Sequence, residues 1–455
     1  MREGSIVVRR AYASMYAQAA LDAVDNYDLA ANHDQDAASQ ESLNSHVPAI
    51  LEPVMALLLL GVYEYCQNAN RRQMRARIYQ ALTISMDLSL HNLSLESPNR
   101  SNAHRRVWWM TVSLSGTRSE CVFLTKLKMY LVYQSAIFNH SSPIVMIHDS
   151  RITTPFPEIC GNRELWPVLM RAQDTLLKTG AIAKELTEDK INGPHELLRE
   201  RVCELDSAVL GLAAELDQPR EMTATGGDDA SASQNLWLKA RFLAHTARIK
   251  LHRFRAFGDY PVFLDKFCDL SAINSSHFSD FSFTLSPGRL ADIDSIFPFT
   301  EQESTHICLK AALALSRILR HFAWPNPFYS DAVAGGKPSD ALRDSTGSCP
   351  PPATRLQYPR SLPYLACCGM QCCYVLMMLL RKVRSSLCSG DLSTCYYLLG
   401  HPEPGTERQD AERLIEELRH GVKSVCLFMA SNAVFEGVIG MAREVETIYS
   451  AHFHD

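Results

Sequence analysis

Fourteen cysteines are the residues of this sequence best suited to metal binding or disulfide formation. They are spread along the whole chain, which is not the pattern of a small disulfide-stapled domain. No two of them differ by three positions, whereas structural zinc sites usually contain C-x2-C pairs. We expect core packing rather than metal binding for the group that lies in one apolar run, Cys367, Cys368, Cys372 and Cys373.

Histidines are the next candidates for catalysis or metal binding. The segment HELLR (195–199) comes closest to the H-E-x-x-H helix of zinc proteases, but its final arginine stays protonated and cannot bind zinc. His245 and His252 share a face of a predicted helix about 10.5 Å apart along its axis, too far for this pair alone to share one zinc ion. We expect both to be solvated or locally hydrogen-bonded. No G-x-S-x-G or G-x-G-x-x-G motif occurs, and we predict no catalytic residues, no metal ligands and no enzyme activity.

Two basic clusters could contact nucleic acid, an import receptor or an acidic partner. One contains four arginines between Arg71 and Arg77, and the other contains six basic residues and one acidic residue between Leu236 and Tyr260. The whole chain has a net charge of −5, so it has no general attraction for nucleic acid. We favour the interpretation that both clusters are solvated helix faces whose arginines pair with acidic helices.

Helical periodicity dominates the sequence and predicts an all-α fold. We expect helices over Leu51 to Cys66, Arg71 to His91 and Leu236 to Phe254. The most hydrophobic stretch, Tyr364 to Leu380, is either a buried core helix or a membrane anchor, and we favour the core helix. A capping box at 406–409 predicts a charged helix that ends at Gly421, followed by a last helix from Lys423 to Tyr449. We expect a polar linker at 223–234 and long loops at 269–298 and 331–363.

Four segments between residues 45 and 160 stand in a distinctive order. They are ALLLL at 56–60, LSLH at 88–91, RRVWW at 105–109, and a stretch from Pro143 to Pro157. This order resembles the regulatory middle homology region of fungal binuclear zinc-cluster transcription factors, the fungal-specific transcription factor domain. Its landmarks are an ALLLL helix, a helix ending in LGLH, an RRRVWW helix, and a proline-then-acidic stretch ending in PLP.

The motif residues have a structural interpretation. Trp108 and Trp109 are adjacent on a helix, point about 100° apart and can wedge two neighbouring helices. Arg105 and Arg106 can pair with carboxylates or helix C-termini. We therefore predict a structural role, rather than ligand contact, for the residues of the motif: His91, Arg105, Arg106, Trp108, Trp109, Pro143 and Pro157.

The resemblance implies a large multi-helix regulatory domain with long irregular loops. The expected divisions are an N-terminal helical lead-in at 1–44, a first part of the regulatory domain at 45–222, the linker at 223–234, and a helical continuation at 235–455. The family's six-cysteine zinc cluster has no counterpart, because only Cys66 precedes residue 121, so no zinc cofactor is expected. Residues 113–129 interrupt the tryptophan helix, and we interpret them as a translated intron or a lineage insertion.

The implied function is transcription regulation in the nucleus. The chain would be either a truncated gene model that lacks the zinc cluster or a cluster-less regulator that acts through other transcription proteins. The resemblance also allows a small-molecule effector. We expect DNA binding by this chain to be weak and nonspecific, and no membrane association. The alternative is a helical metabolite-binding protein or enzyme unrelated to transcription, which requires a cleft with convergent titratable groups.

Overall fold

The computed structural model is all-α, as the periodicity of the sequence predicts. It describes residues 2–31, 47–93, 102–114, 152–159, 162–187, 194–218, 228–258, 287–320, 365–400, 402–403 and 405–453. These ranges contain no β-strand, and an isolated antiparallel bridge joins Ile159 and Asn162. The loop expected at 331–363 lies outside the described residues.

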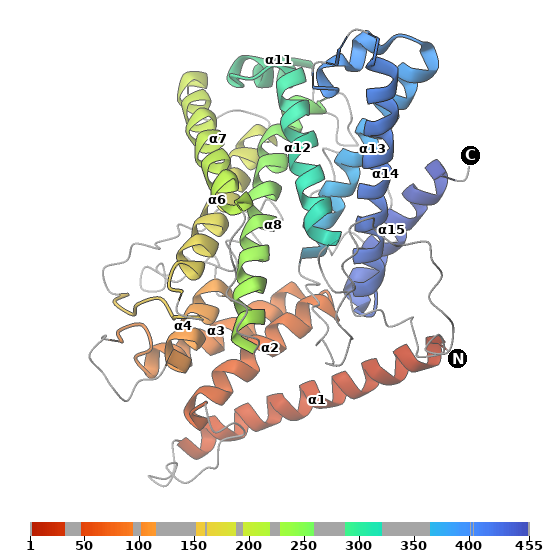
Figure 1. Cartoon of the computed structure of the whole chain (residues 1–455). Coiled ribbons are helices and arrows are strands. Elements are labelled where there is room, and N and C mark those ends of the chain that lie inside the picture. Colours follow the sequence, from red (N-terminus) through yellow and green to blue (C-terminus); the bar gives the residue numbers. More distant parts are fainter. Residues whose placement is uncertain are drawn as a thin grey trace.

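The N-terminal helices lie at one end of the molecule (Figure 1). They are α1 (Arg2–Ala31), α2 (Glu52–Cys66), α3 (Arg71–Asp87) and α4 (Asn102–Leu114). Pro53 stands in the first turn of α2, where an amide hydrogen would have no partner within the helix. Gly61 lets α2 approach α3 closely, because a Cβ atom at this position would lie 2.9 Å from Cγ1 of Ile78.

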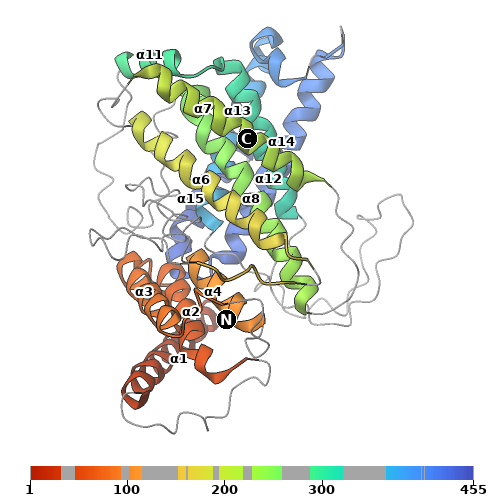
Figure 2. The same cartoon turned by 90° about the vertical axis from the view of Figure 1, so that its left-hand side faces the viewer.

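The middle of the molecule is built around α8 (Asp228–Ala256). Its neighbours are α6 (Leu165–Thr187), α7 (His195–Asp217) and α12 (Glu301–Arg320). Figure 2 shows these helices side by side above the N-terminal layer. Ala240, Ala244 and Ala247 of α8 are fully buried, and their small side chains let the surrounding helices pack closely.

The C-terminal helices complete the fold. They are α13 (Ala366–Ser389), the 3-10 helix η6 (Leu392–Leu398), α14 (Glu407–Asn432) and α15 (Glu436–Phe453). The start of α15 contacts the end of α2, since the amide of Gly437 donates to the carbonyl oxygen of Gln67 at 3.2 Å. A Cβ atom on Gly437 would lie 2.7 Å from the carbonyl oxygen of Cys66, so this junction requires glycine.

Two helices of the described residues, Ala49–Cys66 and α13, are long and apolar enough to cross a membrane. In α13, 83% of the most apolar window is buried inside the protein, which favours the core-helix interpretation. The predicted core packing of its four cysteines is confirmed, because all four are buried. The thiol of Cys372 lies 3.4 Å from the carbonyl oxygen of Ala312, and burial raises its pKa.

The predictions of a linker at 223–234 and a loop at 269–298 were partly wrong. Helix α8 begins at Asp228, because alanine and serine tolerate helix and the two leading aspartates suit a helix N-terminus. Helix α11 (Pro287–Ile296) occupies the end of the second region. Pro287 opens it, and Ile293 and Ile296 are buried in the core.

The prediction that Gly421 ends a helix was also wrong, since α14 continues to Asn432 and the last helix begins at Glu436. Gly421 is a packing position, because a Cβ atom there would lie 3.1 Å from Cδ1 of Leu376. The capping box predicted at 406–409 does not form. The side chain of Thr406 makes no capping hydrogen bond, and its hydroxyl lies 2.8 Å from Oδ2 of Asp410.

Candidate functional site

The motif segments that the sequence places at 88–91 and 105–109 meet the chain at 152–159. After α3, the carbonyl oxygen of His91 accepts from the amide of Thr153 at 3.0 Å. The Thr154 hydroxyl donates to the carbonyl oxygen of Leu90 at 2.6 Å and accepts from the amide of Leu93 at 2.9 Å. The turn after α3 and the TTPFPE segment are therefore held together by a backbone hydrogen bond and by the Thr154 hydroxyl.

The two tryptophans of α4 pack between these segments. Trp108 is fully buried, and its ring centroid lies 6.0 Å from that of His91. Trp109 stacks on Phe156 with 4.1 Å between ring centroids, and its Nε1 donates to the carbonyl oxygen of Pro155 at 3.1 Å. The two rings thus contact different partners, as expected for adjacent positions on a helix.

Polar side chains at the start of α4 hold the end of the same segment. Asn102 donates from Nδ2 to the carbonyl oxygen of Glu158 at 2.7 Å, and Arg106 donates to the same oxygen at 3.2 Å. Arg105 is half-buried, and Pro157 is buried. Pro143 lies outside the described residues, as do residues 115–129 of the interrupting segment.

A turn with unusual backbone geometry ends α3. Ser89 has φ +56°, in the left-handed region where L-amino acids other than glycine are strained. The amide of Leu90 donates to the carbonyl oxygen of Ser85 at 2.9 Å, and that of Ser89 donates to the carbonyl oxygen of Met86 at 2.8 Å. This pair of hydrogen bonds is a Schellman motif, and its left-handed position usually carries glycine.

A second polar cluster lies inside the helical bundle, around His252 of α8. Its Nε2 lies 2.9 Å from Oδ1 of Asp206 on α7, and its Nδ1 lies 3.3 Å from Oγ of Ser304 on α12. The rings of Phe297 and Phe299 contact the imidazole edge-on. Burial lowers the pKa of His252, against the opposing effect of the Asp206 carboxylate.

The residue types of this cluster are those of a hydrolase triad, but the surroundings favour a structural role. His252 and Ser304 are fully buried, and Asp206 is 7% exposed. A nucleophilic serine must reach a substrate carbon, and Ser304 offers no accessible hydroxyl in this state. The hydrogen bonds instead connect three helices through one imidazole.

His245, the other histidine of α8, binds a carboxylate of α7. Its Nε2 lies 3.2 Å from Asp217, which also accepts from Arg241 at 2.7 Å. Burial raises the pKa of Asp217, but His245 and Arg241 outweigh that effect and lower it to about 2. Of the two alternatives expected for the histidines of α8, solvation was wrong, because both are buried, and each is hydrogen-bonded to a neighbouring helix.

The basic face predicted on α8 is only partly solvated, although the predicted pairing of its arginines with acidic residues of other helices does occur. Lys250 and Arg253 are fully buried, and the guanidinium carbon of Arg253 lies 4.8 Å from the ring centroid of Phe254. Burial also lowers the pKa of Arg248. In the other predicted cluster, Arg72 is exposed. Two of the six cations of α8 therefore belong to the interior of the bundle, and the other four are half-buried.

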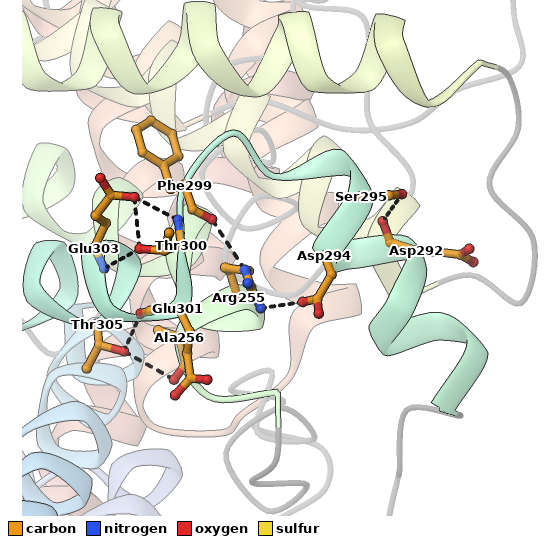
Figure 3. Close-up of polar contacts among 10 residues, drawn as sticks. All are labelled: Arg255, Ala256, Asp292, Asp294, Ser295, Phe299, Thr300, Glu301, Glu303 and Thr305. Carbon is orange, nitrogen blue, oxygen red and sulfur yellow. Dashed lines mark hydrogen bonds and ion pairs between the residues drawn. The ribbon is translucent and has the colours of Figure 1, made fainter. Parts of the chain in front are cut away.

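Figure 3 shows how the end of α8 is tied to α11 and α12. Arg255 forms an ion pair with Asp294 and donates to the carbonyl oxygen of Phe299 at 3.3 Å. A complete capping box opens α12: the amide of Thr300 donates to Oε2 of Glu303 at 2.8 Å, and the amide of Glu303 donates to Oγ1 of Thr300 at 3.2 Å. These contacts fix the position of Ser304 one turn later.

A shallow groove of about 260 Å³ lies between the end of α13 and α14. It contains both charge signs, apolar side chains and an exposed thiol, and its lining residues are Arg384, Leu387, Cys388, Glu412, Ile415, Glu416 and Arg419. No group of three or more potential metal ligands occurs in the part of the chain that the structure describes.

Comparisons with protein-family models, with curated proteins and with solved structures found no match to this chain. Its function must therefore be inferred from its own residues and their geometry.

Proposed function

We propose that this chain is a transcription regulator of the fungal zinc-cluster type, of which it contains the regulatory middle homology domain. In this proposal it acts in the nucleus through other transcription proteins and responds to a small-molecule effector. DNA recognition comes from a zinc cluster encoded upstream or from a partner protein.

The observation that carries the proposal is the turn after α3. The family landmark there ends in LGLH, and this chain has Leu88, Ser89, Leu90 and His91 at the corresponding positions. The residue in place of the motif glycine, Ser89, has φ +56°, a backbone conformation that glycine adopts without strain. Glycine is the residue that a left-handed helix end favours, so the family landmark and the backbone of this chain agree at this position.

The contacts among the motif segments support the same proposal. The LSLH turn, the tryptophan helix and the end of the Pro143–Pro157 stretch contact one another through Trp109 and Thr154, and Arg106 bonds to the adjoining Glu158. Segments that are distant in sequence but belong to one motif are expected to form one structural unit. They form one here.

The charges of α8 support an indirect role on DNA. Lys250 and Arg253 are buried, and Arg255 is paired with Asp294, so these cations offer little to phosphate groups. We expect purified chain to bind DNA weakly, without sequence preference and with a steep loss of affinity as salt is raised. Sequence-specific binding that survives high salt would contradict this part of the proposal.

Chromatin immunoprecipitation of a tagged copy expressed from its own locus tests the proposal in cells. We expect the tagged chain in the nucleus, with enrichment at a defined set of promoters above an untagged strain. Exclusion from the nucleus, or recovery of DNA no greater than in the untagged strain, under every growth condition tested would overturn the proposal.

A further inference from the structure

We propose that the outer face of α1 is a homodimer interface, in which α1 of one copy pairs antiparallel with α1 of a second copy. This inference does not depend on the proposed function. It follows from an apolar stripe on α1 and from the unequal distribution of size and charge along that helix.

The stripe begins with three large side chains that are about half exposed: Val8 (53%), Tyr12 (55%) and Met15 (54%). The exposed residues Ala19 and Ala23 continue it toward the C-terminal end of α1. Successive positions are three or four residues apart, which places them along one side of a helix. Exposed large apolar side chains gathered along one helix are a mark of an interaction surface.

The opposite face of α1 packs against the rest of the protein. Val24 is buried in the core, and Arg10 donates from Nε to the carbonyl oxygen of Val434 at 2.9 Å, in the turn between α14 and α15. Figure 1 shows α1 along the lower edge of the molecule, beneath α2. The stripe therefore faces away from the body of the protein, where a second molecule can approach.

Side-chain size identifies the partner as a second α1 in antiparallel orientation. The stripe is bulky in its N-terminal half and contains only alanine in its C-terminal half. An antiparallel pair centred on Met15 and Tyr16 places Val8 opposite Ala23, and Tyr12 opposite Ala19. Val8 and Tyr12 then each meet an alanine, which is how facing layers fill space without voids, and Met15 lies at the centre of the pair.

Charge favours the same orientation. Apart from Arg10, which is bonded on the opposite face, the N-terminal half of α1 contains Arg2 and Arg9 with one acidic residue, Glu3, while the C-terminal half contains three aspartates and no basic residue. Antiparallel pairing brings the basic half of one helix to the acidic half of the other. A parallel pair would instead place Tyr12 against Tyr12 and Arg9 against Arg9. The contact is two-fold symmetric, so assembly stops at the dimer.

Sedimentation equilibrium of the full chain over a range of concentrations tests the interface. We expect a monomer–dimer equilibrium, and we expect the double variant Tyr12→Glu, Met15→Glu to raise the dissociation constant at least about tenfold. The control is Leu197→Glu on α7, because Leu197 is as exposed as Tyr12, at 55%. It should dimerise like the parent chain.

Circular dichroism verifies that each variant is folded, and Tyr12→Ala with Met15→Ala replaces any variant that is not. A parent chain that stays monomeric at every concentration would overturn the proposal. So would a folded double variant, with either substituent, that dimerises as the parent chain does, or a Leu197→Glu control that dissociates equally.

Disulfide cross-linking under mild oxidation tests the orientation. Met15→Cys should give more covalent dimer than the parent chain, because the two copies of residue 15 lie at the centre of the pair. Val8→Cys should give no increase, because in the antiparallel pair its two copies are about 22 Å apart along the helix axis. Cross-linking through Val8→Cys alone, without Met15→Cys, would contradict the antiparallel arrangement.

Discussion

Ser89 has a backbone conformation that disfavours any residue with a side chain. It is exposed, so its side chain contributes little packing, while its positive φ strains any residue with a Cβ atom. We expect Ser89→Gly to raise the free energy of unfolding by about 1 kcal/mol. Chemical denaturation followed by circular dichroism provides the measurement.

Ser207→Gly is the matched control for that substitution. Ser207 is also exposed, but it lies inside α7, where glycine should destabilise the protein by about 0.5 kcal/mol. If both substitutions lower stability to the same extent, the left-handed turn after α3 is not present in solution.

His252 should make stability depend on pH in a defined range. Because burial lowers its pKa below the ordinary value of 6.5, the unfolded chain binds a proton more readily than the folded protein. Protonation therefore favours unfolding, and the contribution of neutral His252 is present above about pH 6.5 and lost as pH falls below it. We expect His252→Gln to lower stability at neutral pH and to flatten this pH dependence. Urea denaturation at several pH values measures both.

His420→Gln is the control for His252→Gln, because His420 is an exposed histidine of α14. It should leave the pH dependence between neutral and mildly acidic conditions almost unchanged. An equal loss of pH dependence in both variants would show that the buried Asp206–His252–Ser304 cluster is not responsible.

Among the helices, α12 and α14 offer a direct comparison of two capping positions. Thr300 and Glu303 exchange the hydrogen bonds of a capping box, whereas Thr406 does not cap α14. We expect Thr300→Ala to lower the free energy of unfolding by about 1 kcal/mol and Thr406→Ala to have a smaller effect. Thermal unfolding of the two variants tests this order, and the reverse order would contradict the capping geometry.

The same comparison shows what could be predicted from sequence. Both sites have the sequence pattern of a capping box, but the box was predicted only at 406–409, where none forms, and not at Thr300 and Glu303, where one does. The side-chain geometry that separates the two sites depends on the backbone entering each helix. Helix positions were predicted well where apolar residues repeat regularly, as in α2 and α3. The prediction for Gly421 was wrong because sequence alone does not distinguish a glycine that ends a helix from a glycine at a close contact between helices.

The interior of the bundle could not be predicted from sequence for a related reason. Asp206, His252 and Ser304 come from three different helices, separated by about fifty residues at each step, so no local pattern joins them. Lys250 and Arg253 suggested a solvated face because charged residues are rarely fully buried. The motif residues also come from separate segments, and only the resemblance to a known family suggested that they belong together.

At the scale of the molecule, Gly437 joins the last helix to the first layer. A Cβ atom there would meet the backbone carbonyl of Cys66 at 2.7 Å, whereas one at Gly211 of α7 would meet nothing within 4 Å. We expect Gly437→Ala to destabilise the protein by about 1–3 kcal/mol. Gly211→Ala should stabilise it by up to about 1 kcal/mol, since alanine favours helix. Thermal unfolding measures both, and equal effects would contradict the close junction between α15 and α2.

The whole chain, fused to an unrelated DNA-binding module and recruited to a reporter promoter, tests the proposed function most directly. We predict a several-fold change in reporter transcription relative to the module alone. Trp108→Ala, which removes a fully buried side chain at a cost of about 3–5 kcal/mol, should abolish the change, whereas Leu59→Ala at an exposed position should preserve it. Reporter transcription that is identical with and without the chain, at equal protein levels, would contradict a role in transcription regulation.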